Sequence, residues 1–228
     1  MIEQGAHFTV STIRTPASLM EVMQGVKLKY PVIAMDGAVL YDMKENSYLM
    51  KYQMSESQAE RIADFLTQQS EHYFVNTVVD DTVVIYYDIL DNEAQQGIFN
   101  SKRRSPYRNY VHTQNPSYDN VIYFFLIDQK EKIEHLYESL IAQPWASECR
   151  IAKANSVNYP GYAHLKIYHK DATREHMLEN LKAILNLEKT VTFGSIQECY
   201  DVFIEDSDRN LMVREMKKRY KPVCLKHG

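Results

Sequence analysis

The densest group of side chains that could do chemistry is a basic segment, 102–108 (KRRSPYR), which contains Arg103 and Arg104 beside Tyr107 and is followed by Tyr110. Guanidinium groups bind anions through forked N–H donors, and aromatic rings can stack on bases. The segment therefore predicts an anion-binding loop, an RNA contact or a solvated loop, of which the solvated loop is the ordinary outcome. A net charge of −4 makes nucleic acid the least favoured partner.

Other patterns that support chemistry are weak in this chain. The eight histidines are scattered, and the spacings His164/His169 and His169/His176 are not those of a zinc site. The sequence has no glycine-rich phosphate loop and no serine elbow. Its three cysteines form no CxxC pair, which is typical of free thiols in a reducing compartment.

The elements that must position these residues belong to a chain of ordinary globular composition. Of its 228 residues, 45% are apolar and 25% are charged, and the length suits one large domain or two small ones. The apolar run 121–127 is too short to span a membrane, and residues 1–5 lack the features of a signal peptide. We expect a cytoplasmic protein that binds neither membranes nor nucleic acid.

Strands and helices alternate along the sequence, which predicts an α/β or α+β fold. Amphipathic stripes and capping residues predict helices over about 16–26, 55–66, 128–141, 173–185 and 211–216. β-prone runs predict strands at about 8–12, 31–34, 38–41, 48–52, 121–127, 149–154, 164–168, 190–193 and 202–204, with two or three more within 73–90. The polar residues 91–120 are predicted to form a loop.

The middle of the chain differs from its flanks. Residues 55–164 are β-rich with two helices, whereas the flanks consist of strand–helix units. This contrast predicts one domain inserted into another, with a core formed by 1–54 and 165–228 and an insert formed by 55–164.

Three segments, taken in order, resemble the haloacid dehalogenase (HAD) superfamily, in particular its Cof-like sugar-phosphatase subfamily with an inserted α/β cap. Residues 5–16 (GAHFTVSTIRTP) resemble the second family motif, a strand ending in Thr-Gly-Arg before a helix. Residues 31–42 (PVIAMDGAVLYD) resemble its Asn-Gly-Ala strand, with Asp36 in place of Asn. Residues 172–181 and 190–195 resemble the third and fourth motifs. The resemblance implies a HAD-like Rossmannoid core, truncated at its first strand, with the central insert as cap.

The resemblance also implies roles for individual residues. Thr12 matches the Thr that holds the transferring phosphoryl oxygens, and Arg14 matches the Arg beside it, with Ile13 in place of Gly. Arg174 falls on the position of the family's Lys and keeps its charge, while a looser alignment places Lys170 there. Thr12 and Arg174 would then be catalytic. Substrate contacts are expected from Arg14, Asp36, Gly37, Arg103 and Arg104.

Two departures from the family pattern concern the nucleophile and the metal. The family's Asp-x-Asp precedes the second motif, and none occurs in the seven residues before Phe8. Ser195 stands at the metal position and is a poor magnesium ligand, and Glu198-Cys199 replaces the Asn-Asp that follows it. The sequence has one Asp-x-Asp, at 206–208, which is either a permuted nucleophile or, more ordinarily, a strand end with Asp208 as a helix N-cap.

Two functions stay open at this point. The first is a catalytically impaired HAD-like protein without a cofactor, which binds a phosphorylated small molecule or acts as an interaction module, as a monomer or a homo-oligomer. The second is a magnesium-dependent HAD-type sugar-phosphate phosphatase, with its nucleophile upstream of Met1 or at Asp206 and Asp208. In either case we expect Thr12 to face the helix that begins near Arg174. We also expect the strands at 8–11 and 190–193 to pair directly.

Overall fold

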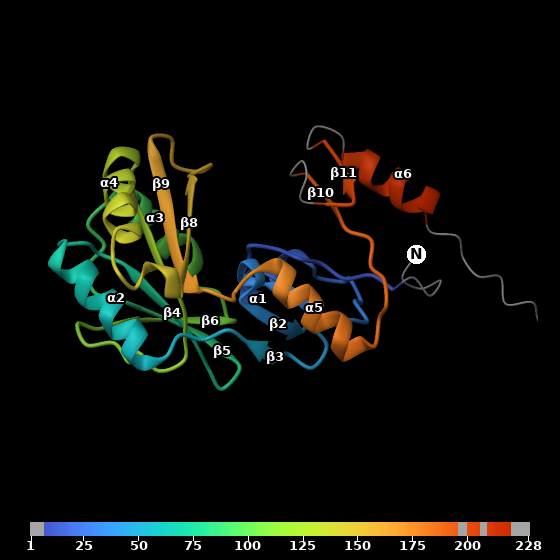
Figure 1. The fold of residues 1–228 in the computed structure, drawn as a ribbon, viewed down its shortest axis with the longest axis horizontal. Coiled ribbons are helices and arrows are strands. Elements are labelled where there is room, and N and C mark those ends of the chain that lie inside the picture. The colour runs from blue at the N-terminus through green and yellow to red at the C-terminus, as the bar shows by residue number, and fades with distance from the viewer. Residues whose placement is uncertain (1–6, 196–199, 206–208, 220–228) are drawn as a thin grey trace, which may run out of the picture.

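A computed structural model describes residues 7–195, 200–205 and 209–219 of the chain (Figure 1). Its first sheet is small and antiparallel, with the strand order β1-β2-β3. The strands are β1 (Val32–Ala34), β2 (Val39–Asp42) and β3 (Ser47–Lys51). Because apolar residues occupy both faces of β1 and nearly all of β2, this strand pair is buried. The predicted strands at 31–34 and 38–41, with a turn between them, are therefore confirmed.

The turn between β1 and β2 is a short 3-10 segment in which every residue has a positive φ. The φ angles are 50° at Met35, 58° at Asp36 and 90° at Gly37. A left-handed conformation costs a non-glycine residue roughly 1–2 kcal/mol. Such a turn persists only where its surroundings hold it in place.

The N-terminal segment lies parallel to β1 through a single bridge between Ser11 and Ile33. The Thr12 N–H donates to the Ile33 carbonyl at 2.9 Å. Helix α1 (Pro16–Val22) then begins after Thr15, whose hydroxyl accepts a hydrogen bond from the Ser18 N–H. The predicted helix start is confirmed, while the strand predicted at 8–12 is reduced to one bridge.

The second sheet is larger and has the order β6-β5-β4-β7-β9-β8. All its neighbours are antiparallel except β5 and β6. Its strands are β4 (Phe74–Val79), β5 (Thr82–Tyr87), β6 (Arg108–His112), β7 (Val121–Gln129), β8 (Cys149–Asn155) and β9 (Tyr162–His169). The strands predicted within 73–90 and at 121–127, 149–154 and 164–168 are therefore confirmed.

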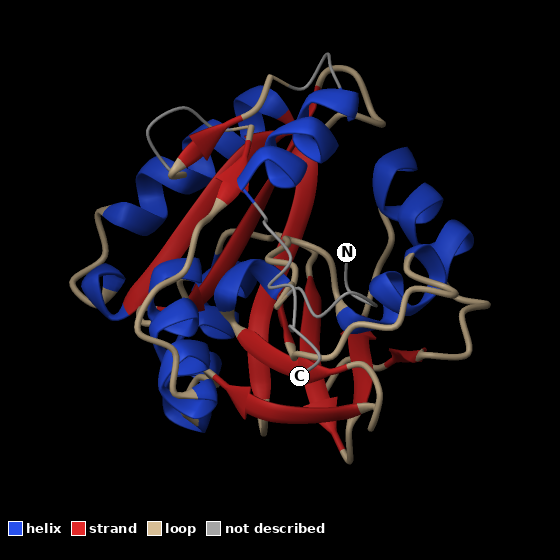
Figure 2. Cartoon of the chain, turned by 90° about the vertical axis from the view of Figure 1, so that its right-hand side faces the viewer, coloured by secondary structure: helices blue, strands red, loops and turns tan. Residues whose placement is uncertain are grey.

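Helices α2 (Glu56–Gln68) and α4 (Lys130–Ile141) pack along one face of the larger sheet (Figure 1), and Figure 2 shows the helices and strands of the chain from a second direction. Leu66 of α2 and Leu136 of α4 share one buried cluster with Phe124 and Leu165 of the sheet. Ser55 caps α2, as the capping box predicts. The short 3-10 helix Ala146–Glu148 leads from α4 into β8.

The region 91–120 is not the loop that the sequence predicts, because it contains α3 (Glu93–Lys102) and β6. Helix α3 is largely polar and contains a glycine, so its pattern does not resemble a core helix. A Cβ at Gly97 would lie 2.1 Å from the Tyr159 hydroxyl. Gly97 is therefore explained by the close packing of α3 against Tyr159 and does not indicate a loop.

The two sheets share a hydrophobic cluster. Leu19 and Val39, on the side of the small sheet, belong to the same buried group as Phe74, Ile85 and Tyr168 of the larger sheet. The sequence boundary at 164/165 falls within β9. The division into a core and an inserted cap stays a prediction.

Helix α5 (Arg174–Leu185) packs on the small sheet, where Met177 and Leu181 form a buried cluster with Ile33 and Leu40. The chain then leads to the parallel pair β10 (Phe193–Gly194) and β11 (Val202–Phe203), and to α6 (Arg209–Arg219). Figure 1 shows these last elements standing apart from the small sheet.

The prediction that the strands at 8–11 and 190–193 pair directly is wrong. Both segments are described, and no backbone hydrogen bond joins residues 8–12 to residues 190–194. Instead β10 pairs with β11, and Asp201 accepts hydrogen bonds from both the N–H and the hydroxyl of Thr192. These local contacts give the backbone of residues 192–194 hydrogen-bond partners other than the N-terminal segment that lies beside β1.

Several sequence predictions lie outside the described residues, namely those on Glu198, Cys199, Asp206 and Asp208. Within the described ranges, no helix has the length and apolar character needed to cross a membrane.

Candidate functional site

The candidate site forms where the Asp36 turn meets the N-terminus of α5. A Cβ on Gly37 would lie 2.2–2.4 Å from backbone atoms of Thr173 and Arg174, so only glycine permits this approach. Thr173 caps the helix, and its hydroxyl accepts a hydrogen bond from the His176 N–H at 3.1 Å. The helix N-terminus, which favours negative charge, is thereby held against the turn that carries Asp36.

Two arginines from distant parts of the chain bind the carboxylate of Asp36. Arg174 Nε donates to Oδ1 at 2.7 Å, and Arg150 Nη1 donates to Oδ2 at 2.9 Å. Arg150 Nη2 also donates to the Asp36 carbonyl at 3.0 Å. Arg174 Nη1 reaches the Tyr200 hydroxyl at 2.8 Å. We call Asp36, Arg150 and Arg174 the carboxylate cluster; it joins the small sheet, β8 and α5.

The charges of the carboxylate cluster favour the ionised form of Asp36. Burial alone would raise the pKa of this carboxyl, but the hydrogen bonds and charges of Arg150 and Arg174 outweigh burial and hold the pKa below its usual value. The exposed fractions of the three side chains lie between 21% and 26%. The cluster is therefore ionic and largely fixed at neutral pH.

Thr12 lies next to this cluster. The Asp36 N–H donates to the Thr12 carbonyl at 3.0 Å, and the Arg14 N–H donates to the Thr12 hydroxyl at 3.2 Å. Thr12 is half-buried, whereas Arg14 is exposed. Most of the predicted site residues thus lie together: Thr12, Arg14, Asp36, Gly37 and Arg174. Their roles in binding and catalysis stay predictions.

The basic segment makes a different contact from the one predicted. Arg108 is buried and donates from Nη2 to the Ser18 hydroxyl at 2.9 Å, which ties β6 to α1. Arg103 and Arg104 are exposed beyond the end of α3, and the Arg103 guanidinium lies 5.6 Å from the centroid of the Phe99 ring. In the described structure neither of them bonds to the carboxylate cluster.

Sequence reasoning missed two cations of the larger sheet. The Arg150 guanidinium lies 4.2 Å from the centroid of the Tyr168 ring. Lys166 of β9 is paired in register with Phe125 and Ala152 on the neighbouring strands. A signal was present in the sequence, because each is a basic residue inside a predicted strand whose neighbours are apolar.

The described residues do not fit a magnesium site at this cluster. Magnesium prefers carboxylate and water oxygens, and both carboxylate oxygens of Asp36 already accept bonds from arginines. Ser195, at the predicted metal position, is exposed. The described ranges contain no group of three His, Cys, Asp or Glu side chains that could hold a metal ion.

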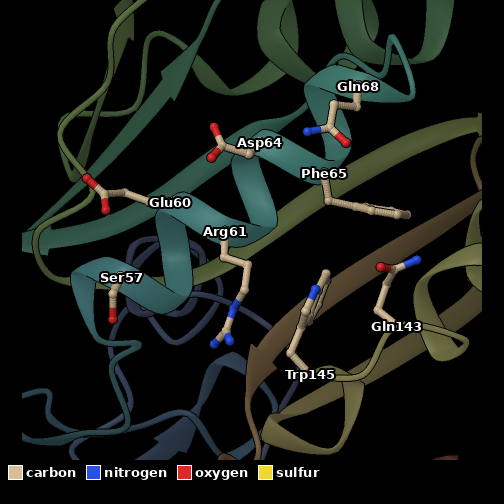
Figure 3. Close-up of a pocket in the computed structure, with 8 residues that line it drawn as sticks. All are labelled: Ser57, Glu60, Arg61, Asp64, Phe65, Gln68, Gln143 and Trp145. Atoms are coloured by element: carbon tan, nitrogen blue, oxygen red, sulfur yellow. The ribbon is translucent and has the colours of Figure 1, made fainter.

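A hollow of about 390 Å³ lies elsewhere, along α2 (Figure 3). Trp145 and Phe65 line it, edge to face, with ring centroids 5.8 Å apart. Arg61 lies 5.8 Å from the Trp145 ring centroid and pairs with Glu148 at 2.6 Å. Because these groups satisfy one another, the hollow offers weaker chemistry than the carboxylate cluster.

Comparisons with known proteins concern the family and the fold. The sequence profile of the haloacid dehalogenase-like hydrolase family matches residues 1–196. No curated protein sequence is significantly similar to this chain.

Solved structures show the same fold. A haloacid dehalogenase-like hydrolase from B. subtilis has a TM-score of 0.60 and 18% identity, over 85% of this chain and 72% of that one. Another from Bacteroides thetaiotaomicron has a TM-score of 0.63 and 11% identity, over 84% and 70%. A phosphatase of the same superfamily, also from that organism, has a TM-score of 0.56 and 13% identity, over 82% and 62%. At such identities the likeness concerns the α/β fold.

Proposed function

Since the chain belongs to the haloacid dehalogenase-like hydrolase family, we propose that it binds a phosphorylated small molecule at the carboxylate cluster and the adjoining Thr12 segment. One observation carries the proposal: two guanidinium groups, of Arg150 and Arg174, converge on a single anionic group beside the N-terminus of α5. Guanidinium forks bind carboxylates and phosphates with the same geometry. The arrangement suits a phosphate at this position.

The cluster keeps donors free for a ligand. Arg174 uses Nε and Nη1 for its described contacts, which leaves Nη2 available. The Thr12 segment, with the Thr12 hydroxyl and the exposed Arg14, is joined to Asp36 through the Asp36 N–H. A phosphate bound between them would accept hydrogen bonds from Arg174, Thr12 and Arg14 together.

The proposal includes slow or absent turnover of the bound ester. Ser195 replaces a carboxylate at the family's metal position. Asp36 is a poor nucleophile because two arginines neutralise its carboxylate. Binding without hydrolysis is the outcome that these two residues favour.

The second candidate is a magnesium-dependent sugar-phosphate phosphatase. It is favoured by the contacts of Thr12 and Arg174 with Asp36, which the family resemblance leads us to expect, and by the phosphatase among the structurally similar proteins. It requires a nucleophile from Asp206 and Asp208 or from a segment before Met1.

The larger sheet has a part in either function. It supplies Arg150 to the carboxylate cluster, so its residues contribute to the same site as those of the small sheet. We propose that residues 55–164 act as a cap over the Thr12 segment.

Isothermal titration calorimetry with inorganic phosphate and glucose 6-phosphate tests the first candidate. Arg174→Met should weaken binding at least tenfold, and Arg174→Lys should restore part of it because the charge returns. Arg61→Met, which removes a paired arginine of α2, should leave binding unchanged. Absence of binding to the native chain overturns the proposal.

A phosphatase assay with magnesium and a panel of sugar phosphates separates the two candidates. The first predicts no turnover above background. Turnover that disappears in Asp206→Asn would instead establish the second candidate, with a permuted nucleophile.

A further inference from the structure

The candidate site carries more positive charge than its own carboxylate neutralises. Electrostatic interactions connect Lys166 with Lys102, Arg150 and Arg174, and connect Lys102 in turn with Arg14. Asp36 is the carboxylate coupled to Lys166, and it already pairs with two arginines. Lys102 also interacts with Arg108 and with the carboxylate of Glu21. Six cations therefore accompany two carboxylates, an excess of four positive charges in a chain whose net charge is −4.

Among these cations, Lys166 is the one whose positive charge is most clearly uncompensated. Its side chain is half-buried on β9, and its Nζ lies 5.6 Å from the Tyr123 ring centroid and 6.0 Å from that of Phe125. In the described part of the chain its ammonium group has no ion pair or hydrogen bond. Burial, together with Lys102, Arg150 and Arg174, lowers the pKa of Lys166 to about 8 against the opposing pull of Asp36. An ammonium in this position is costly unless an anion joins it.

Two buried polar atoms beside the carboxylate cluster have no hydrogen-bond partner. Among the described residues, the buried side-chain atoms without a partner are Arg150 Nε, the Tyr168 hydroxyl and, at the contact of β6 with α1, Arg108 Nε. Tyr168 has no exposed surface, and its ring lies under the Arg150 guanidinium. Unsatisfied buried polar groups are uncommon in native structures, and each requires an explanation. Two of the three lie beside the carboxylate cluster, where a bound anion would change their surroundings.

From these observations we infer that the ligand carries two separated anionic groups, a phosphate ester near Thr12 and Arg174 and a second phosphate or carboxylate at Lys166. This inference rests on the proposed function and narrows its ligand class. A phosphate monoester brings about two negative charges, which offset roughly half of the four unmatched positive charges. A second anionic group neutralises the rest.

Protonation sets the pH range of this second contact. The ionisable groups coupled to Lys166 are Asp36, Lys102, Arg150 and Arg174, and Lys166 itself lowers the pKa of His164 on the same strand. The ammonium group of Lys166 itself loses its charge as the pH rises through about 8. The preference for a second anionic group should therefore decline as the pH rises above about 8.

Calorimetry with three probes tests the inference: glucose 6-phosphate, fructose 1,6-bisphosphate and 6-phosphogluconate. The native chain should bind the bisphosphate or the phosphorylated acid at least tenfold more tightly than the monophosphate, and the better of the two identifies the second group. Lys166→Met should abolish this preference while leaving monophosphate affinity within about twofold. Lys166→Arg should retain the preference.

Lys153→Met is the matched control, because Lys153 lies on the neighbouring strand β8 and is paired with Glu134. It should leave all three affinities unchanged. Thermal unfolding checks the fold of each variant, and Lys166→Met should have a higher midpoint because it removes an unpaired ammonium.

The outcomes separate this inference from the proposed function. Equal binding of all three probes by the native chain overturns the inference and leaves phosphate binding intact. An equal loss of all three affinities in Lys166→Met, with the fold retained, also overturns it. Failure of every probe to bind overturns both proposals.

Discussion

The two sheets of this molecule differ in what holds them together. The six-stranded sheet buries its own cluster with α2 and α4, including Phe124, which has no exposed surface. The small sheet has three short strands and shares its main cluster with the larger sheet. It also contains three consecutive residues with positive φ, at Met35–Gly37.

This difference separates stability from binding. The larger sheet is a framework that carries Arg150 and Lys166, and the small sheet carries the strained turn whose Asp36 binds Arg150. Strain at a turn that bears charged side chains is more typical of a functional site than of a scaffold. Substitutions in the two regions should therefore have different consequences.

The largest effect is expected in the framework. Phe124→Ala should lower the free energy of unfolding by about 3–5 kcal/mol, because it leaves a cavity between the sheet and helices α2 and α4. Urea denaturation followed by circular dichroism measures the change. Ile141→Ala on α4, where the side chain is half exposed, should cost much less. A loss below about 1 kcal/mol in Phe124→Ala would contradict the role of the larger sheet as framework.

A smaller loss is expected in the turn, where it should affect binding as well. Gly37→Ala adds a Cβ at positive φ against the backbone of Thr173 and Arg174, and it should cost about 2–3 kcal/mol. Gly25→Ala is the control, since Gly25 has a similar φ of 85° with nothing within 4 Å of its added Cβ. Both variants strain the backbone, but only Gly37→Ala should displace α5 and weaken phosphate binding. If both variants lose stability and phosphate affinity equally, the close approach of Gly37 to the backbone of α5 does not explain the loss.

The next effect concerns the charge of the carboxylate cluster. Asp36→Asn removes the internal anion and releases two arginines, so the affinity for inorganic phosphate should rise about threefold to tenfold, roughly 0.6–1.4 kcal/mol. Asp64→Asn on the exposed face of α2 is the charge-matched control and should change nothing. Weaker phosphate binding in Asp36→Asn would show that the carboxylate positions the arginines rather than competing with the ligand.

The same residue predicts how stability depends on pH. Because the folded-state pKa of Asp36 is depressed, its contribution is present above the unfolded value of about 3.9 and is lost as the pH falls through the lower folded value. Acid titration should show that the free energy of unfolding falls further in the native chain than in Asp36→Asn below about pH 4. Parallel acid profiles would indicate that the two arginines do not stabilise the ionised carboxylate.

The smallest effect is expected at the helix caps, one in each region. Thr173→Ala and Ser55→Ala each remove an N-cap side chain, of α5 and α2, and should each cost about 1 kcal/mol in thermal unfolding. Only Thr173→Ala should also weaken phosphate binding, by a few fold, because Arg174 is the first residue of α5. Similar binding in both variants would place the ligand away from the N-terminus of α5.

Most regular elements of the framework could be predicted from the sequence. The capping box at Ser55, the apolar stripes of α2 and α4 and the buried run of β7 are local patterns, so they were readable without tertiary contacts. Family resemblance also placed Thr12, Asp36 and Arg174 in one region, and the structure brings them together. Helix α3 was missed because its glycine packs on Tyr159, a residue distant in sequence.

The assembly of the site depends on contacts between segments that are distant in the sequence. Arg150 lies 114 residues from Asp36 in the sequence and contacts it because β8 is the edge strand of a sheet packed on the small sheet. Lys166 gains its significance from neighbours on other strands and helices, which no local pattern encodes. The pairing of β10 with β11 was likewise decided by competition between possible strand partners. Local patterns specify elements because they depend on adjacent residues, whereas charge balance and strand partnership depend on the whole packed chain.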